Sequence, residues 1–416
     1  MHARQRYLSQ LCFITALACC PPWQAMAQDV GDMQIFGSMQ SLMFHQESRL
    51  RQQQLPSGSS IELSEARTTF ALQQLDFFFD KQFGNEFSAF VDLEFQLNYS
   101  SEKHWGSLSI QEAWMNYRLS DALDVKLGLL FPAFNNFNEM KNRLAVQPYV
   151  LRPLVYERLL SSRFMTEDYI PEHAYAQISG QVPWGNFFAD YAVYMGNSES
   201  SYMSHYDDQG NIITDLNPNF EFLSGVDPTD ISLKLFGARL GLRSRDEHVK
   251  AGFSITRDAN NMHARATRNR GIFSEEALLL LPDDARRFRF GCDVSLHHAG
   301  FTLEGEIIKV GYELGRAEVL NLRLEQWFAY VVLGYDVTQH LYPYVSMQWG
   351  DYNFGVDSDY FVGTTGFALR LNSAITAKAQ WVLFSERANN VPIATGIRIN
   401  SNMRMLFYLF GLSVLL

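Results

Sequence analysis

Residues 87–99 read FSAFVDLEFQLNY, and this stretch decides the fold. Its odd positions, from Phe87 to Tyr99, are all apolar or aromatic, whereas its even positions are mostly polar. A repeat of two residues is that of a β-strand whose two faces meet different surroundings. A tilted membrane strand needs about 9–11 residues, whereas soluble strands average about 5–6. The stretch therefore predicts a strand that crosses a membrane.

The same repeat continues along the chain. In residues 287–297 the even positions, from Phe288 to Leu296, are apolar, and the odd positions carry Arg287, Arg289 and Asp293. Reading on in this way predicts sixteen strands, at 33–44, 67–80, 87–99, 107–119, 124–133, 173–182, 187–195, 231–243, 248–256, 286–297, 301–310, 323–335, 341–349, 361–371, 375–384 and 404–416.

The connections between these segments alternate in length. The short ones are 81–86, 120–123, 183–186, 244–247, 298–300, 336–340 and 372–374. The others are 45–66, 134–172, 196–230, 257–285, 311–322, 350–360 and 385–403, with 100–106 as a short exception. Tight periplasmic turns opposite long outer loops are typical of outer-membrane barrels. We therefore expect an all-β, transmembrane, antiparallel up-and-down β-barrel of about sixteen strands rather than a soluble sandwich.

The chain begins with features of an export signal. His2, Arg4 and Arg6 precede the short apolar run 11–18, and Ala25-Met26-Ala27 has the small-x-small pattern of a cleavage site. This pattern predicts a signal peptide at 1–27 and a barrel at 28–416. A lipoprotein signal ending at Cys19 is the weaker alternative.

Charge and cysteine content exclude several classes of protein. Removal of residues 1–27 takes away two arginines and no acid, so the net charge changes from -11 to -13. An acidic exported chain has no electrostatic reason to bind nucleic acid. Only Cys292 lies beyond the predicted signal, which leaves no intrachain disulfide. Aromatic residues make up 14% of the chain, as suits a barrel with interfacial girdles.

The longest connection, 134–172, carries six aromatic residues. A loop of this length is usually functional or disordered, and its aromatic content argues against disorder. We expect this third loop to fold into the lumen and narrow it. The alternative is a lid over the mouth.

The chain resembles the phosphate-selective porin O and P family and its relatives among the general porins. Three stretches carry the resemblance: DVKLGLLFP at 124–132, GFTLEGE at 300–306, and GYD at 334–336 with LYPYV at 341–345. The resemblance implies a sixteen-stranded homotrimeric channel whose third loop enters the pore. Two features depart from the family: the last residue is Leu416 instead of an aromatic, and the third loop has Lys141 instead of a row of lysines. Phosphate selectivity therefore does not carry over.

Charged residues on the inward phase of the strands are the candidates for the pore lining, because charge facing lipid is costly. The candidates are Lys126, Arg239, Arg243, Lys250, Arg287, Arg289, Arg370, Lys378, Glu304 and Glu306. Cations of the third loop are candidates for the constriction: Lys141, Arg143, Arg152, Arg158 and Arg163. One interpretation is a positive constriction that prefers anions. The other is that the arginines pair with inward carboxylates and stiffen the wall.

These features predict a porin through which small hydrophilic solutes diffuse, with no cofactor and no metal. The expected partners are outer-membrane lipid and lipopolysaccharide. Arg265, Arg268 and Arg270 form a basic cluster in a predicted outer loop, which we interpret as a solvated loop rather than as a contact for lipopolysaccharide phosphates. No Gly-x-Ser-x-Gly or His-Glu-x-x-His motif is present, so we expect no enzyme. An outer-membrane hydrolase, whose Ser-His-Asp site would come from distant strands, is the alternative. A structural or adhesive barrel with a blocked lumen is a third.

Overall fold

The computed structural model describes residues 33–55, 57–98, 107–157, 169–197, 233–260, 285–313, 325–353, 357–394 and 397–416. The predicted signal peptide at 1–27 lies outside these residues, as do Arg158, Arg163 and the arginines at 265, 268 and 270. Residues Gln34–Leu416 form one compact unit.

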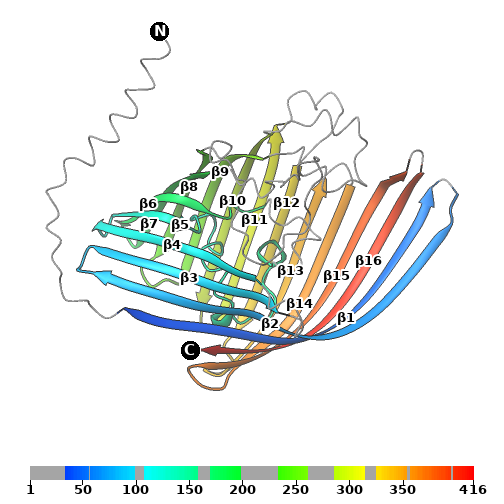
Figure 1. Ribbon diagram of the computed structural model, residues 1–416, viewed down its shortest axis with the longest axis horizontal. Coiled ribbons are helices and arrows are strands. Elements are labelled where there is room, and N and C mark those ends of the chain that lie inside the picture. The colour runs from blue at the N-terminus through cyan, green and yellow to red at the C-terminus, as the bar shows by residue number, and fades with distance from the viewer. Residues whose placement is uncertain are drawn as a thin grey trace, which may run out of the picture. The chain divides into compact units, whose positions relative to one another are not determined.

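Sixteen strands in the described residues form a closed antiparallel barrel in which each strand pairs with its neighbours in the sequence (Figure 1). This confirms the predicted up-and-down barrel. The strands are β1 (Gln34–Leu55), β2 (Ser60–Phe83), β3 (Phe87–Asn98), β4 (Ser107–Ser120), β5 (Leu123–Leu130), β6 (Ala174–Trp184), β7 (Phe187–Asn197), β8 (Leu233–Ser244), β9 (Val249–Asn260), β10 (Ala285–His298), β11 (Phe301–Glu313), β12 (Glu325–Tyr335), β13 (Leu341–Asn353), β14 (Asp357–Arg370), β15 (Ile375–Ala394) and β16 (Ile397–Leu415).

The first and last strands close the barrel. β1 pairs with β16 from Ser38↔Leu415 to Leu55↔Arg398. Beyond the last strand, Gly37 and Leu416 exchange two backbone hydrogen bonds, with N···O distances of 3.2 and 2.8 Å. The Leu416 terminus, which departs from the usual aromatic ending, is thus tied to the start of β1. Closure leaves neither terminal strand with an open edge.

The period-two pattern separates the inner from the outer surface. In β10 the side chains of Arg287, Arg289 and Asp293 are buried inside, while Phe290 and Val294 are exposed outside. Similar exposed apolar residues occur on other strands, among them Leu127, Val193, Leu240, Phe253, Ile307, Leu333, Val345, Leu383, Phe410 and Leu412. An apolar outer band of this kind suits contact with lipid tails.

All the connections at one rim are short. They are 84–86, 121–122, 185–186, 245–248, 299–300, 336–340 and 371–374. The opposite rim differs from the prediction, because at three connections expected to be long the flanking strands extend until only 56–59, 354–356 and 395–396 separate them. Their flanking strands continue well past the predicted ends. The predicted boundaries fell where the apolar alternation stops, but hydrogen bonding between strands continues through polar sequence beyond the lipid.

The extension is largest at the seam of the barrel. β1 and β2 pair as far as Gln53↔Ser60, and β15 and β16 as far as Ala394↔Ile397. These two hairpins also pair with each other through β1 and β16 and lie side by side at the right of Figure 1. We call residues 45–55, 60–70, 385–394 and 397–404 the outer extension.

Candidate functional site in the barrel lumen

The connection between β5 and β6 enters the lumen and organises the candidate site. Its described parts, 131–157 and 169–173, include two single turns of 3-10 helix, η1 (Leu144–Val146) and η2 (Leu154–Tyr156). η1 contacts β1 and β16, so the loop crosses the lumen to the seam of the barrel. No helix among the described residues is long and apolar enough to span a membrane.

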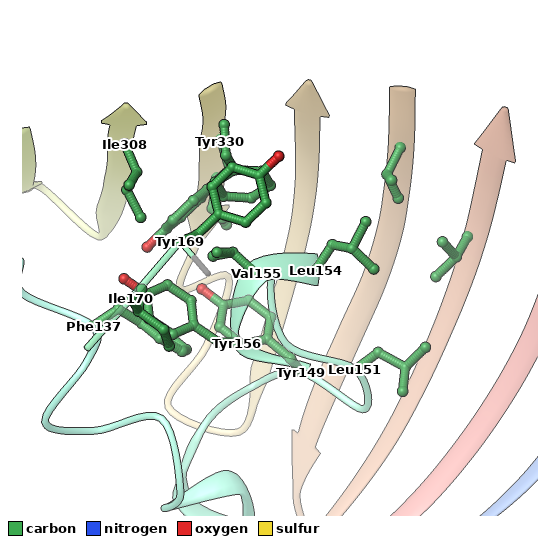
Figure 2. Packing of buried hydrophobic residues seen from close by; sticks show 14 of the residues in the cluster. Phe137, Tyr149, Leu151, Leu154, Val155, Tyr156, Tyr169, Ile170, Ile308 and Tyr330 are labelled. Carbon is green, nitrogen blue, oxygen red and sulfur yellow. The ribbon is translucent and has the colours of Figure 1, made fainter. Parts of the chain in front are cut away.

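An apolar surface of the loop packs against an apolar part of the inner wall (Figure 2). Phe137 lies between the ring of Tyr156, 4.7 Å away between centroids, and the ring of Tyr330 on β12, 6.4 Å away. The buried loop residues in this cluster are Phe134, Phe137, Tyr149, Val150, Leu151, Leu154, Val155, Tyr156, Tyr169 and Ile170. Their partners on the wall include Ile308, Val310, Phe328, Tyr330, Val332, Tyr344, Tyr360, Val362, Val382, Phe384, Phe407 and Leu409. The inner face of β11 to β16 is therefore a hydrophobic core that the loop completes.

Glu306 on β11 holds the start of the loop. Its carboxylate accepts hydrogen bonds from Tyr156 Oη at 2.5 Å, from Phe137 N at 2.9 Å and from Asn135 Nδ2 at 3.4 Å. Glu304, two residues earlier, accepts one from Tyr149 Oη at 3.4 Å. Burial raises the pKa of the Tyr149 and Tyr156 phenols well above their usual value, so both remain donors.

Glutamines of the wall bind the backbone of the loop. Gln380 Oε1 on β15 accepts from the N–H groups of Val150 and Leu151, each at 2.8 Å, and its Nε2 donates to Leu151 O at 3.1 Å. Gln348 Oε1 on β13 accepts from Leu154 N at 2.7 Å. A buried backbone segment without its own sheet or helix needs such partners. The glutamines therefore fix the position of the loop.

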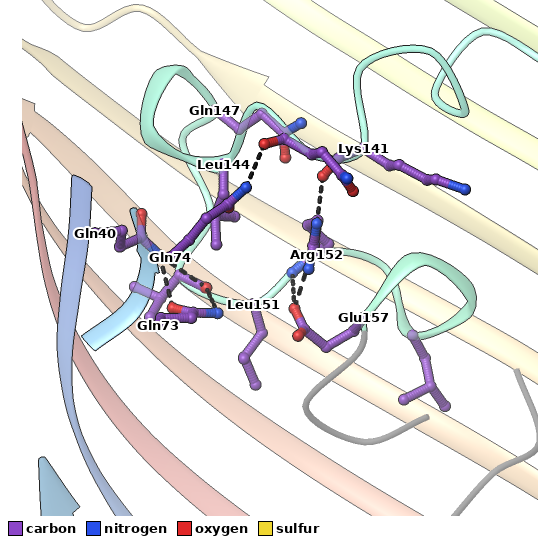
Figure 3. Close-up of polar contacts among 12 residues, drawn as sticks. Gln40, Gln73, Gln74, Lys141, Leu144, Gln147, Leu151, Arg152 and Glu157 are labelled. Carbon is purple, nitrogen blue, oxygen red and sulfur yellow. Dashed lines mark hydrogen bonds and ion pairs between the residues drawn. The ribbon is translucent and has the colours of Figure 1, made fainter. Parts of the chain in front are cut away.

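Glutamine side chains also bind the loop backbone from the other side of the loop (Figure 3). Gln40 and Gln73 both donate to Val150 O at 3.1 Å, and Gln74 donates to Asn142 O at 2.5 Å. These three residues come from β1 and β2, across the seam from Gln380. The loop is thus bonded to both sides of the closure.

Two cations stabilise the loop. Lys378 Nζ on β15 donates to Leu144 O at 2.9 Å and to Gln40 Oε1 at 2.8 Å. Arg152 pairs with Glu157 at 3.5 Å and donates to the backbone oxygen of Lys141 (Figure 3). Both are almost fully buried, so their charges act within the loop and its anchors instead of facing solvent.

The opposite part of the lumen contains a polar cavity of about 330 Å³. Loop residues Ala133, Asn136 and Glu139 form one side of it, and β5 to β9 form the other. Its charged lining holds four acids and four bases: Asp121, Asp124, Glu139, Asp190, Lys126, Arg239, Arg243 and Lys250. Because Asp121 and Asp124 adjoin a short turn, the cavity lies toward the short-turn rim.

Ion pairs join β8, β9 and β10 on the inner face of the barrel. Arg239 binds both oxygens of Asp293, with one N···O distance of 2.9 Å, and lies 3.8 Å from Asp190. Arg287 and Arg289 are fully buried and both bind Asp258, with distances of 2.9 and 3.2 Å. These pairs hold β8, β9 and β10 together on the inner face.

A separate acidic wall lies on β2, β3 and β4. Asp76 faces Glu94 and Asp92 faces Glu112 in the register of these strands, and all four side chains are buried. No group of three or more His, Cys, Asp or Glu side chains in the described residues has the geometry to hold a metal ion. We therefore assign no metal to this wall.

The predicted pore residues fall into distinct places. Lys126, Arg239, Arg243 and Lys250 line the polar cavity, and Lys126 Nζ also lies 4.8 Å from the ring of Trp114. Glu304, Glu306 and Lys378 hold the loop, whereas Arg287 and Arg289 lie in the wall. Arg370 is exposed at the short-turn rim, 3.6 Å from Asp336.

The predicted loop cations also differ in their surroundings. Lys141 is buried, with Nζ 4.7 Å from the ring of Phe131, and Arg152 is buried against Glu157, whereas Arg143 is exposed. Sequence reasoning missed the anchoring glutamines, because it looked for charge. The available signal was glutamine at inward positions of otherwise apolar strands, as at Gln348 and Gln380.

One turn contains the residue types of a hydrolase triad. Asp246 accepts from Ser244 Oγ at 2.5 Å and contacts His248 Nδ1 at 2.7 Å. The hydrogen bonds from Ser244 and His248 lower the pKa of Asp246 to about 2. The carboxylate thus lies between the hydroxyl and the imidazole, whereas a triad needs the imidazole in the middle. This arrangement caps an exposed turn.

No family model and no curated protein matches the chain. Among solved structures, an anion-selective porin from Comamonas acidovorans is similar over 92% of this chain and 99% of its own, with a TM-score of 0.52 and 12% identity. The chain has the barrel fold of a porin. The outer-membrane channel DcaP of Acinetobacter baumannii matches 91% of this chain and 97% of its own, with a TM-score of 0.47 and 12% identity. At 12% identity, the likeness to the anion-selective porin identifies the fold alone.

The location follows from the barrel itself. A closed antiparallel barrel with an apolar outer band and one rim of tight turns is the form in which strands cross a bacterial outer membrane. The chain is an outer-membrane protein of the Gram-negative type. In this orientation the short-turn rim faces the periplasm, and the outer extension faces the outside of the cell.

Proposed function

We propose that this protein is a porin, which lets small hydrophilic solutes diffuse passively across the outer membrane. One observation carries the proposal: the third loop covers the apolar part of the inner wall and leaves a polar cavity beside it. Water and small polar solutes are stable against a charged and hydrogen-bonding surface and not against the hydrophobic core. The loop therefore directs solutes to one side of the lumen.

The test is the conductance of the purified full chain in planar bilayers, with two tryptophan variants at adjacent residues of β6. Ser179 lines the cavity, whereas the neighbouring Ile178 is exposed on the outer face. Ser179→Trp fills part of the cavity and is expected to lower the single-channel conductance. Ile178→Trp adds the same side chain toward lipid and is expected to leave it unchanged.

Each other outcome of this experiment contradicts the proposed pathway. Equal conductance in Ser179→Trp and the unchanged protein would mean that solutes do not use this cavity. Silence from a correctly folded, heat-modifiable barrel would favour the blocked lumen, and chromogenic ester and peptide substrates would then test the hydrolase alternative.

The proposal includes a channel with weak ion selectivity. The cavity has as many acids as bases, and Arg239, Arg243 and Lys250 have carboxylates within ion-pair distance. The anion preference expected from the wall cations is tested by the reversal potential in a salt gradient. A value near zero fits paired wall charges, and a clear anion-favouring value fits a positive constriction.

A homotrimer is the assembly that we propose, on the basis of the resemblance to trimeric porins. Conductance steps in multiples of three, together with the mass of the unheated protein, test this assembly. A monomer that conducts in single steps would contradict it and leave the diffusion pathway intact.

A further inference from the structure

Four arginines gather on the outer face of the outer extension. Arg49 and Arg51 come from β1, Arg387 from β15 and Arg404 from β16, and all four are exposed. Arg49 is the direct register partner of Arg404, and both Arg51 and Arg387 are register partners of Asn402. Because partners across neighbouring strands share a face of the sheet, the four side chains form one patch. We call these residues the arginine patch.

The centre of the patch, Arg49 and Arg404, is electrostatically unfavourable. Two like charges directly opposite each other destabilise a strand pair, yet Arg49 and Arg404 occupy such a pair. In the part of the chain that the structure describes, no ion pair or side-chain hydrogen bond joins any of the four guanidinium groups to a carboxylate. Arg51 and Arg387 each face an acid directly across the strands, Glu62 and Asp359, although no ion pair joins them in the described residues. Arg49 and Arg404 face each other and no acid, and the nearby Glu47 contacts His45 at 3.6 Å.

The position of the patch beside the lipid-facing band indicates which kind of partner it meets. On the same face, continuing toward the membrane, Arg404 is followed by Leu406, Tyr408 and Phe410, and their neighbours on β15 include Trp381 and Leu383. All five are exposed apolar or aromatic side chains of the lipid-facing band. Arg404 lies four residues from Tyr408, which is about 13 Å along a strand. With a strand tilt of about 35–45°, this places the arginines roughly 10 Å above an interfacial tyrosine, at the level of lipid headgroups.

We propose that the arginine patch binds the phosphate groups of the phosphorylated glycolipid in the outer leaflet, the lipid A part of lipopolysaccharide. A guanidinium group can donate two parallel hydrogen bonds to a phosphate group. A phosphate between Arg49 and Arg404 also relieves the repulsion between these two side chains. The apolar band below the patch is continuous with it and receives the acyl chains of the same lipid. The proposal depends on the barrel and its orientation and not on the solute that crosses it.

The experiment titrates the folded full chain, delipidated in mild detergent, with bisphosphorylated lipid A and counts bound lipid by native mass spectrometry. Arg49→Gln or Arg404→Gln is expected to weaken binding about fivefold, and the double variant about thirtyfold. Arg67→Gln is the matched control, because Arg67 lies on the opposite face of the same extension and is paired with Glu65 at 2.7 Å. It is expected to leave binding within about twofold, which is less than the effect of one interfacial arginine.

Further probes separate the sources of phosphate. Lipid A that lacks one phosphate is expected to bind more weakly. Phosphatidylethanolamine is expected to bind weakly, and inorganic phosphate at millimolar concentration is expected to compete poorly with lipid A. Equal lipid A binding by the double variant and Arg67→Gln would overturn the proposal. So would unchanged lipid binding accompanied by a smaller oligomer, because the patch would then contact a second copy of the chain.

Discussion

Replacing Gln380 by leucine tests how firmly the polar anchors hold the third loop. The change leaves the N–H groups of Val150 and Leu151 and the oxygen of Leu151 without their partner. Each buried unpaired group costs about 1–3 kcal/mol, so the three together cost at least about 3 kcal/mol. A loss of about 3 kcal/mol raises the ratio of displaced to seated loop about 150-fold.

The assay is the single-channel record of Gln380→Leu, in which a displaced loop appears as frequent steps to a second conductance level. Gln326→Leu is the matched control, because Gln326 is also a buried glutamine of the inner wall, but its side chain makes no hydrogen bond to the described residues. Replacing it is expected to be neutral or slightly stabilising. The reasoning is refuted if Gln380→Leu gives the same steady record as Gln326→Leu.

Three further predictions concern the barrel itself. Asp258→Asn removes the carboxylate that Arg287 and Arg289 share, and it is expected to lower the free energy of unfolding by about 3–5 kcal/mol. The loss is measured as a lower unfolding midpoint in heat-modifiability gels. Glu313→Gln, which removes an exposed ion pair with Arg286, is the control and is expected to cost less than about 1 kcal/mol. Gly128 has φ +124° and no room for a Cβ, so Gly128→Ala is expected to lower the same midpoint by more than Gly311→Ala, where the space is open. The folded pKa of Asp246 is about 2, below the ordinary value of 3.8, so its contribution to the turn is present above pH of about 4 and lost as pH falls toward 2; carboxyl NMR shifts that titrate near 4 would contradict this.

The sequence was sufficient to predict the barrel, because each membrane strand shows lipid and lumen alternately. The stretch 87–99 has that alternation, and β3 occupies 87–98. The ends of the outer strands could not be predicted in the same way. Residues 45–55 read HQESRLRQQQL, which is polar on both faces, yet they continue β1. Above the membrane both faces meet water, so the hydrophobic signal ends while the hydrogen bonds between strands continue.

The candidate site was less accessible to sequence reasoning. An inward lysine such as Lys126 is identified by its phase on the strand, and it lines the cavity. Whether an inward cation faces water or supports the loop depends on tertiary contacts. Lys378 shows this, because it has the same strand phase but donates to the backbone of the loop. The role of Gln380 likewise depends on a segment 229 residues away in the sequence.

The contacts of the third loop with both sides of the seam constrain the order of assembly. Gln40 on β1 and Gln380 on β15 bind the same stretch of the loop, and η1 rests against β1 and β16. A loop joined at both ends to adjacent strands enters the lumen most easily while the sheet is still open. The pairing of β1 with β16 is then the final step, made over a loop already in place. Variants that slow loop seating are therefore expected to accumulate as unclosed sheets on the membrane, a kinetic defect that appears before any change in the finished barrel.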